Sequence, residues 1–261
     1  MAAVFYPSAA IAPRSVTGQE RVHAHTLGHG AAGHAISLCS DDERPLVRDI
    51  QKVTRQTIPA EDRRMIYQKG NYLWHADSSF RPAGSLCSLL SARIVPPEGG
   101  NTEFASMTAA YDALPDDAKH KLEGLVAEHS LVYSRETVTQ NALTPEMKAE
   151  LPGAWQTMLR THPVTGRKAV YAGAHASHVI GWPMEEGRAF IRWLNDFATQ
   201  PRFCFSHAWR AGDLVIWDNR FTLHRATAYD TVRHKRLMQR TTVKGEALTA
   251  AQPERYELAA A

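Results

Sequence analysis

The 261-residue sequence predicts a mainly β fold with helices, in which two sheets pack together and helical segments are inserted between strands. Short apolar segments recur along the chain between Gly- and Pro-containing turns. Only a few stretches show the period of an amphipathic helix. Hydrophobic residues make up 44% and charged residues 22% of the chain, a composition that supplies a sizeable core and is typical of globular rather than disordered proteins.

The two ends of the chain differ from its middle. Residues 1–45 are rich in Ala, Gly and His without a clear period, so we expect a poorly ordered N-terminal extension there rather than a His-rich metal tract. Residues 46–245 are expected to form the folded domain, and residues 246–261 a C-terminal tail.

The first part of the folded domain is predicted to contain a strand followed by two short helices. Ser85–Pro96 is an apolar run that ends at a Pro-Pro pair, as expected of a strand. Ser106–Leu114 and Asp116–Leu125 have helical spacing, and Ser106 is suited to cap the first of them.

The second part is predicted to alternate strands with one long helix. Pro183–Ala198 is the strongest helical segment, because Pro183 suits a first turn and the apolar residues share one face. That face consists of Phe190, Ile191, Leu194, Phe197 and Ala198. Residues 137–155 are expected to form a loop with a short helix. Strands are expected at Glu128–Tyr133, Ala169–Tyr171, Phe203–Ala208, Leu214–Trp217 and Leu237–Val243.

Charge and cysteine content exclude several classes of partner. The 30 basic and 27 acidic residues are interspersed, so no basic footprint for nucleic acid is present. No apolar run reaches the ~18–20 residues of a membrane span. We therefore expect neither a nucleic-acid nor a membrane partner. The three cysteines are odd in number and widely spaced, which favours a reducing, cytoplasmic location.

Two segments far apart carry candidate metal ligands. In the first, Trp74-His75-Ala76-Asp77, side chains two apart in an extended chain point to the same face, so His75 and Asp77 can reach one ion. Such a pair is common by chance. In the second, the predicted strand at 214–217 leads to His224. Two His and one carboxylate form the facial triad of non-haem Fe(II) oxygenases.

Two arginines follow His224. Arg236 and Arg240 are four residues apart with Met238 between them, so on a strand all three share a face. A charged side chain that points into a β core needs a partner. Guanidinium groups near a metal site therefore indicate anionic ligands held by bidentate hydrogen bonds.

In this order, the motifs resemble the 2-oxoglutarate-dependent dioxygenases, and within them the family of taurine dioxygenase and 2,4-dichlorophenoxyacetate dioxygenase. The amino-acid sequences of Leu73–Phe80 and Gly173–Val179 are more similar to the phenoxyacetate branch than to the taurine branch. The matching stretches are Leu73–Phe80, Pro97–Phe104, Ala109–Leu114, Thr161–Lys168, Gly173–Val179, Trp217–Arg220 with His224, and Arg240-Thr241-Thr242.

The resemblance implies a double-stranded β-helix, or jelly-roll barrel, that binds Fe(II), 2-oxoglutarate and O2. His75, Asp77 and His224 would hold the iron. Thr102 would bind a carboxylate of 2-oxoglutarate, and Arg236 its distal carboxylate. Lys235 competes for the second role, because the loop after His224 is one residue longer than in typical members.

The resemblance also implies a substrate class: a small anionic organic molecule, such as an aryloxyalkanoate carboxylate, hydroxylated with release of succinate and CO2. Arg240 would hold its anionic group, and Ser78, His175 and His178 would contact it. The alternatives are a taurine or alkylsulfonate dioxygenase and a catalytically silent metal-binding homologue. The segment before His75 is shorter than in typical members, so contacts from that region are not carried over. A homo-oligomer is compatible with the sequence.

Overall fold

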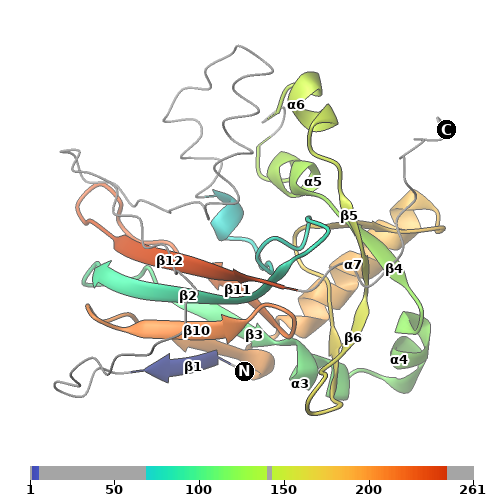
Figure 1. The fold of residues 1–261 in the computed structure, drawn as a ribbon, viewed down its shortest axis with the longest axis horizontal. Helices are drawn as coiled ribbons and strands as arrows, with labels where there is room; N and C mark the ends of the chain where they lie inside the picture. Colours follow the sequence, from blue (N-terminus) through green and yellow to red (C-terminus); the bar gives the residue numbers. More distant parts are fainter. Residues whose placement is uncertain (1, 6–68, 140–142, 246–261) are drawn as a thin grey trace, which may run out of the picture.

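The computed structural model describes residues 2–5, 69–139 and 143–245 (Figure 1). The predictions for most of the N-terminal extension and for the tail at 246–261 lie outside these residues. Within them the chain is mainly β with a few helices, as the sequence predicts.

The largest sheet has four antiparallel strands in the order β1-β10-β2-β12. They are β1 (Ala2–Phe5), β2 (Ser85–Ile94), β10 (Leu214–Asp218) and β12 (Leu237–Lys244). Three of them confirm predicted strands, whereas β1 was not anticipated. Because β2 pairs with both β10 and β12, its residues are central to the sheet (Figure 1).

A second sheet of three strands, in the order β11-β3-β9, faces the first. It consists of β3 (Thr102–Ser106), β9 (Cys204–His207) and β11 (Thr222–Ala226). Phe104 of β3 and Val215 of β10 belong to one buried apolar cluster, which also contains Trp217. The rings of Phe104 and Trp217 lie 5.3 Å apart. The two sheets therefore share a core.

Two smaller sheets complete the β structure. One has the order β5-β4-β8, and the other pairs β6 with β7. Their strands are β4 (Val126–His129), β5 (Ala154–Thr157), β6 (Leu159–Thr161), β7 (Lys168–Val170) and β8 (Ala176–Val179).

The strand predicted over Glu128–Tyr133 is wrong in its second half. The strand ends at His129, and helix α5 (Leu131–Glu136) begins after Ser130. The Ser130 hydroxyl accepts a hydrogen bond from the backbone N–H of Tyr133 at 3.2 Å. This N-cap satisfies a helix-terminal donor, and it overrides the strand propensity of the residues that follow.

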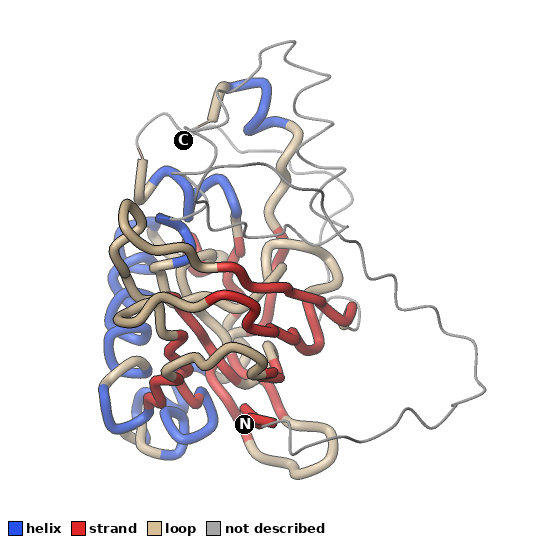
Figure 2. The backbone as a smooth tube through the Cα atoms, turned by 90° about the vertical axis from the view of Figure 1, so that its left-hand side faces the viewer, coloured by secondary structure: helices blue, strands red, loops and turns tan. Residues whose placement is uncertain are grey.

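Most helices lie along one side of the molecule (Figure 2). As predicted, Ser106 caps α3 (Met107–Asp112). The longest helix is α7 (Met184–Ala198), which buries Ile191 and Leu194. Further helices are α4 (Asp116–Leu122), α6 (Pro145–Ala149) and the 3-10 turn η1 (Pro201–Phe203). Among the described residues, no helix is both long and apolar enough to cross a bilayer.

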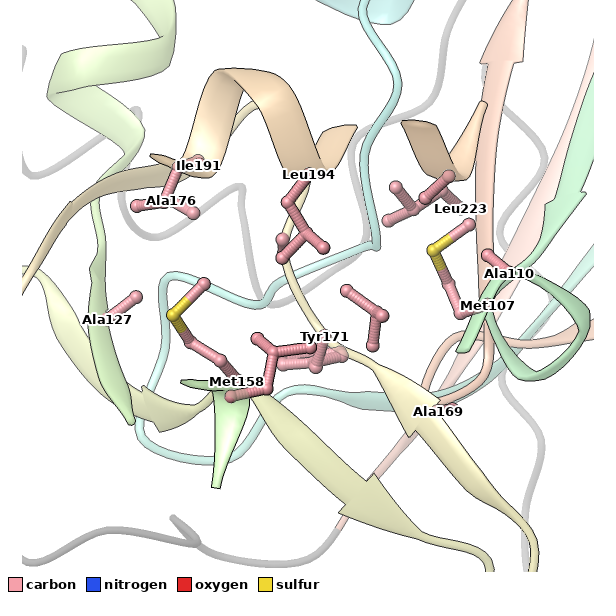
Figure 3. Packing of buried hydrophobic residues seen from close by; sticks show 14 of the residues in the cluster. Met107, Ala110, Ala127, Met158, Ala169, Tyr171, Ala176, Ile191, Leu194 and Leu223 are labelled. Atoms are coloured by element: carbon pink, nitrogen blue, oxygen red, sulfur yellow. The ribbon is translucent and has the colours of Figure 1, made fainter. Parts of the chain in front are cut away.

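A second apolar core lies between the helices and the strands (Figure 3). Met107, Met158 and Tyr171 are almost wholly buried there beside Leu194 and Leu223. Leu223 directly precedes His224 on β11. The core therefore fixes the strand that carries one predicted metal ligand.

Gly173 brings a distant backbone segment against the first metal-ligand motif. Its φ of +105° lies in the region that side chains disfavour. A Cβ at this position would lie 3.0 Å from Leu223 Cδ2 and 3.2 Å from the Trp74 carbonyl oxygen. The next residue, Ala174, donates its N–H to that same carbonyl at 2.8 Å. A side chain here would push the segment containing His75.

We expect Gly173→Ala to lower stability by roughly 2 kcal/mol or more, because backbone strain and a collision act together. A thermal melt would show this as a fall of roughly 4–8 °C in Tm. Gly166→Ala is the matched control, because Gly166 has φ +68° but nothing within 4 Å of its Cβ position. Equal melting temperatures for the two variants would contradict the steric argument.

Candidate active site

The two predicted histidine ligands are joined through their backbones. His75 donates its N–H to the His224 carbonyl at 3.0 Å, and His224 donates back to the His75 carbonyl at 2.9 Å. This is an isolated antiparallel bridge between β11 and the segment before β2. Because residues directly opposed across such a pair point to the same side, the two imidazole rings lie 4.3 Å apart.

Asp77 follows two residues after His75, in a turn that is fixed at both ends. Its backbone N–H donates to Asn219 Oδ1 at 3.1 Å, and its carbonyl accepts from the N–H of Ser85 at 3.3 Å. Ser78 has φ +55°, and its carbonyl accepts from the N–H of Arg81 at 3.0 Å. The turn therefore holds the Asp77 carboxylate beside both rings.

The three side chains suit a metal ion. Their candidate ligand atoms all lie within 4.8 Å of one another, and all three residues are buried. His75 Nε2 lies 3.8 Å from Asp77 Oδ1, and His224 Nε2 lies 3.7 Å from Asp77 Oδ2. These distances are too long for hydrogen bonds. His75 Nδ1 lies 2.7 Å from the Leu73 carbonyl, to which only a protonated nitrogen donates, so Nε2 keeps its lone pair.

Burial sets the protonation of the site. It lowers the pKa of His75, and it lowers the pKa of His224 to about 3. Both rings are therefore neutral near pH 7, which is the form that binds metal. Burial alone would raise the pKa of Asp77, but Arg240 and the two histidines outweigh it, and the pKa lies well below the usual carboxyl value. Two neutral imidazoles and one carboxylate are a suitable donor set for Fe(II).

A hydrogen-bond network fixes the Asp77 carboxylate. Ser88 Oγ on β2 donates to Oδ2 at 2.6 Å, and Arg240 Nη1 on β12 donates to Oδ1 at 2.8 Å. Asn219 Nδ2 donates in turn to Ser88 Oγ at 2.8 Å. Asn219 Oδ1 also accepts from the Trp217 indole N–H at 3.0 Å. Each carboxylate oxygen thus has a partner, which fixes the orientation of the group.

Sequence reasoning missed Ser88 and Asn219. Asn219 lies within the matching stretch Trp217–Arg220, but the sequence indicates no role for its side chain. Ser88 is a buried polar residue in an apolar strand. A buried hydroxyl in such a strand needs a partner. The position of Ser88 in an apolar strand was therefore the signal in the sequence that could have identified it.

Arg240 is paired with a carboxylate of the protein itself. The prediction placed a substrate anion on this guanidinium, and in the structure Nη1 is paired with Asp77. The Arg240 side chain remains 18% exposed. Its predicted contact with substrate stays a prediction.

Arg236 and Thr102 lie on adjoining segments. Arg236 precedes β12, and its Nε donates to the Gly100 carbonyl at 3.1 Å. Gly100 has φ +67°, and a Cβ there would lie 3.2 Å from Arg236 Cδ. Thr102 begins β3 two residues later and is 3% exposed. Arg236 is partly buried whereas Lys235 is exposed, which favours Arg236 over its neighbour as the partner of a buried anion.

The two remaining histidines have different surroundings. The His175 ring lies 6.0 Å from that of His75 and 4.9 Å from that of Phe80. His175 Nδ1 lies 2.9 Å from Ser134 Oγ, whose hydrogen is donated to the Leu131 carbonyl. Nδ1 is therefore the protonated nitrogen of His175, and burial lowers the pKa of this ring well below its usual value.

His178, by contrast, lies in a cluster with Ser177 and Glu128. Its Nδ1 is 2.9 Å from Ser177 Oγ and 3.4 Å from Glu128 Oε2. These are the contacts of a sheet residue on β8. The predicted substrate contacts of Ser78 and His178 stay predictions.

Comparison with known proteins identifies the family to which this chain belongs. A family model described as "Taurine catabolism dioxygenase TauD, TfdA family" matches residues 19–242, and the chain belongs to this family.

Two similar proteins are named as dioxygenases that depend on alpha-ketoglutarate. The chain is 44% identical over 184 residues to the alpha-ketoglutarate-dependent 2,4-dichlorophenoxyacetate dioxygenase of Burkholderia sp. (strain RASC), covering 70% of this chain and 62% of that protein. It is 40% identical over 189 residues to the (S)-phenoxypropionate/alpha-ketoglutarate-dioxygenase of Sphingobium herbicidovorans, covering 68% and 64%. The chain thus spans less than two thirds of the length of these relatives.

Two solved structures differ in how similar they are to this chain. AAD-2 in complex with Mn(II) and N-oxalylglycine is 50% identical, with a TM-score of 0.67, covering 69% of this chain and 71% of that one. A taurine dioxygenase from Burkholderia xenovorans is 26% identical, with a TM-score of 0.58, covering 68% and 58%. The similarity is greater to AAD-2 than to this taurine dioxygenase.

We expect Ser88→Ala to weaken Fe(II) binding about 10-fold, because an oriented carboxylate ligand loses one of its two fixing bonds. An anaerobic Fe(II) titration would measure this without turnover. Ser91→Ala on the same strand is the control, since Ser91 is paired across the sheet but lies outside the Asp77 network. Unchanged affinity in Ser88→Ala would refute the role of the hydroxyl.

Proposed function

We propose that the protein is an Fe(II)- and 2-oxoglutarate-dependent dioxygenase. In this proposal it hydroxylates a small organic carboxylate of the aryloxyalkanoate type and releases succinate and CO2. The observation that carries it is the buried cluster of His75, Asp77 and His224. Relatives named as 2,4-dichlorophenoxyacetate and phenoxypropionate dioxygenases support the substrate class.

The fold that we infer for this function is the double-stranded β-helix, or jelly-roll barrel. The support is the pair of antiparallel sheets, β1-β10-β2-β12 and β11-β3-β9, which share an apolar core. The candidate ligand His224 lies beside this core, since the Trp217 ring is 4.7 Å from its ring.

Fe(II), held by His75, Asp77 and His224, would supply oxygen activation coupled to decarboxylation of 2-oxoglutarate. The chain's own part is to bind and orient. The guanidinium of Arg236 and the hydroxyl of Thr102 would hold the distal carboxylate of 2-oxoglutarate. Fixing Arg236 Nε on the Gly100 carbonyl leaves its terminal nitrogens for that anion.

Arg240 and His175 would hold the substrate. Arg240 supplies a cation beside the metal-ligand residues. His175 carries its proton on Nδ1 toward Ser134, so its Nε2 cannot donate to an anion. His175 therefore fits better as an aromatic wall, together with Phe80, for the ring of an aryloxyalkanoate.

A substrate panel tests the proposal. Purified protein with Fe(II), 2-oxoglutarate and O2 should form succinate when given 2,4-dichlorophenoxyacetate or (S)-phenoxypropionate, and less with taurine or an alkyl sulfate. His224→Ala should abolish succinate formation. A preference for taurine would favour the alkylsulfonate alternative. Fe(II) binding without succinate from any acid would identify a silent homologue.

At saturating Fe(II), Arg240→Ala should raise the apparent KM for the substrate acid by 30-fold or more, because a desolvated charge pair is worth about 2–5 kcal/mol. The apparent KM for 2-oxoglutarate should change far less. Arg93→Ala is the control, since Arg93 is exposed and bonds Gln239 on the same sheet. Equal effects of Arg240→Ala on both compounds would refute the assignment.

A further inference from the structure

We propose that Trp209 is a positioning residue, which turns the Thr102 hydroxyl into a hydrogen-bond donor for the distal carboxylate of 2-oxoglutarate. This inference rests on the proposed function. It explains how a neutral hydroxyl, able both to donate and to accept, is committed to binding an anion.

The geometry fixes the direction of the hydrogen bond. The Trp209 indole Nε1–H donates to Thr102 Oγ1 at 3.0 Å, and the two residues are 8% and 3% exposed. An indole nitrogen only donates, whereas a hydroxyl has one hydrogen and two lone pairs. Trp209 therefore occupies a lone pair of Thr102 and leaves its hydrogen available.

That hydrogen has no acceptor among the hydrogen bonds of the described residues, where the Thr102 hydroxyl bonds only Trp209. Thr102 lies two residues from Gly100, whose carbonyl holds Arg236 Nε. A buried donor without a partner costs free energy. A carboxylate bound by Arg236 would supply the missing acceptor.

Trp209 is itself braced. The His207 ring meets it edge to face, with centroids 4.6 Å apart at 87°. His207 Nε2 lies 3.0 Å from Asp213 Oδ2, which also accepts the N–H of Arg210 at 2.8 Å. These contacts fix the loop from β9 to β10 and restrict the rotamers of Trp209. The indole N–H is therefore held in the position from which it donates to Thr102.

The test compares Trp209→Phe with wild type for two 2-oxo acids. Trp209→Phe keeps the aromatic ring and removes the N–H. We expect the anaerobic dissociation constant of 2-oxoglutarate from the Fe(II)-loaded protein to rise about 3- to 10-fold, the effect of one hydrogen bond. The dissociation constant of 2-oxopentanoate, which lacks the distal carboxylate, should not change. A general loss of folding would weaken the binding of both acids alike. An equal rise of the two dissociation constants would overturn the proposal.

A double-mutant cycle gives the second measurement. In the Thr102→Val background, adding Trp209→Phe should not weaken 2-oxoglutarate binding further, because the hydroxyl is already gone. Additive effects would overturn the proposal, as would an unchanged dissociation constant in Trp209→Phe alone. Trp193→Phe on α7 is the control for removal of an indole N–H. Failure of wild type to bind 2-oxoglutarate would instead refute the proposed function itself.

Discussion

The pair of backbone hydrogen bonds between His75 and His224 is the constraint on which the candidate site depends. It joins the segment before β2 to β11 of the second sheet, although the two are far apart in sequence. Side chains alone would not hold two imidazoles side by side, since each has rotamer freedom. The bridge sets the Cα positions of the two histidines, and the backbone at Gly173 packs closely against the segment that contains His75. The side-by-side placement of the two rings is therefore a consequence of this backbone bridge.

The sequence predicted those elements whose signal is local. β2 and β10 were found because they are runs of mostly apolar residues, and α7 because its apolar residues have helical spacing. β11 was missed because Thr222, Leu223 and His224 are all buried, so no alternation marks it. The candidate metal ligands were still named, because residue type and order carry that information, and the structure brings the three side chains together. Their proximity was not derivable from local patterns, because it depends on an isolated bridge between β11 and a segment far away in the sequence.

The network around Asp77 was outside the reach of sequence reasoning for a related reason. Ser88 and Asn219 meet because Trp217 is paired with Ser88 in the register of β10 and β2. A shift of one residue would turn Ser88 to the other face and leave Asp77 without this donor. The same burial makes the pairing with Arg240 necessary, because an uncompensated carboxylate in the interior is strongly destabilising. The stability of the sheet and the geometry of the site thus depend on one register.

The two arginines differ in what balances their charge. Arg236 is anchored on the neutral Gly100 carbonyl, so its positive charge remains for an incoming anion. Arg240 is balanced by Asp77 at 2.8 Å. A divalent cation among the three ligand residues adds positive charge next to this pair, and the carboxylate cannot neutralise both the cation and Arg240. Metal binding therefore makes the surroundings of Arg240 more favourable for a second anion. Under the proposed function, occupation of the metal site would therefore raise the affinity of Arg240 for an anionic substrate through the shared partner Asp77.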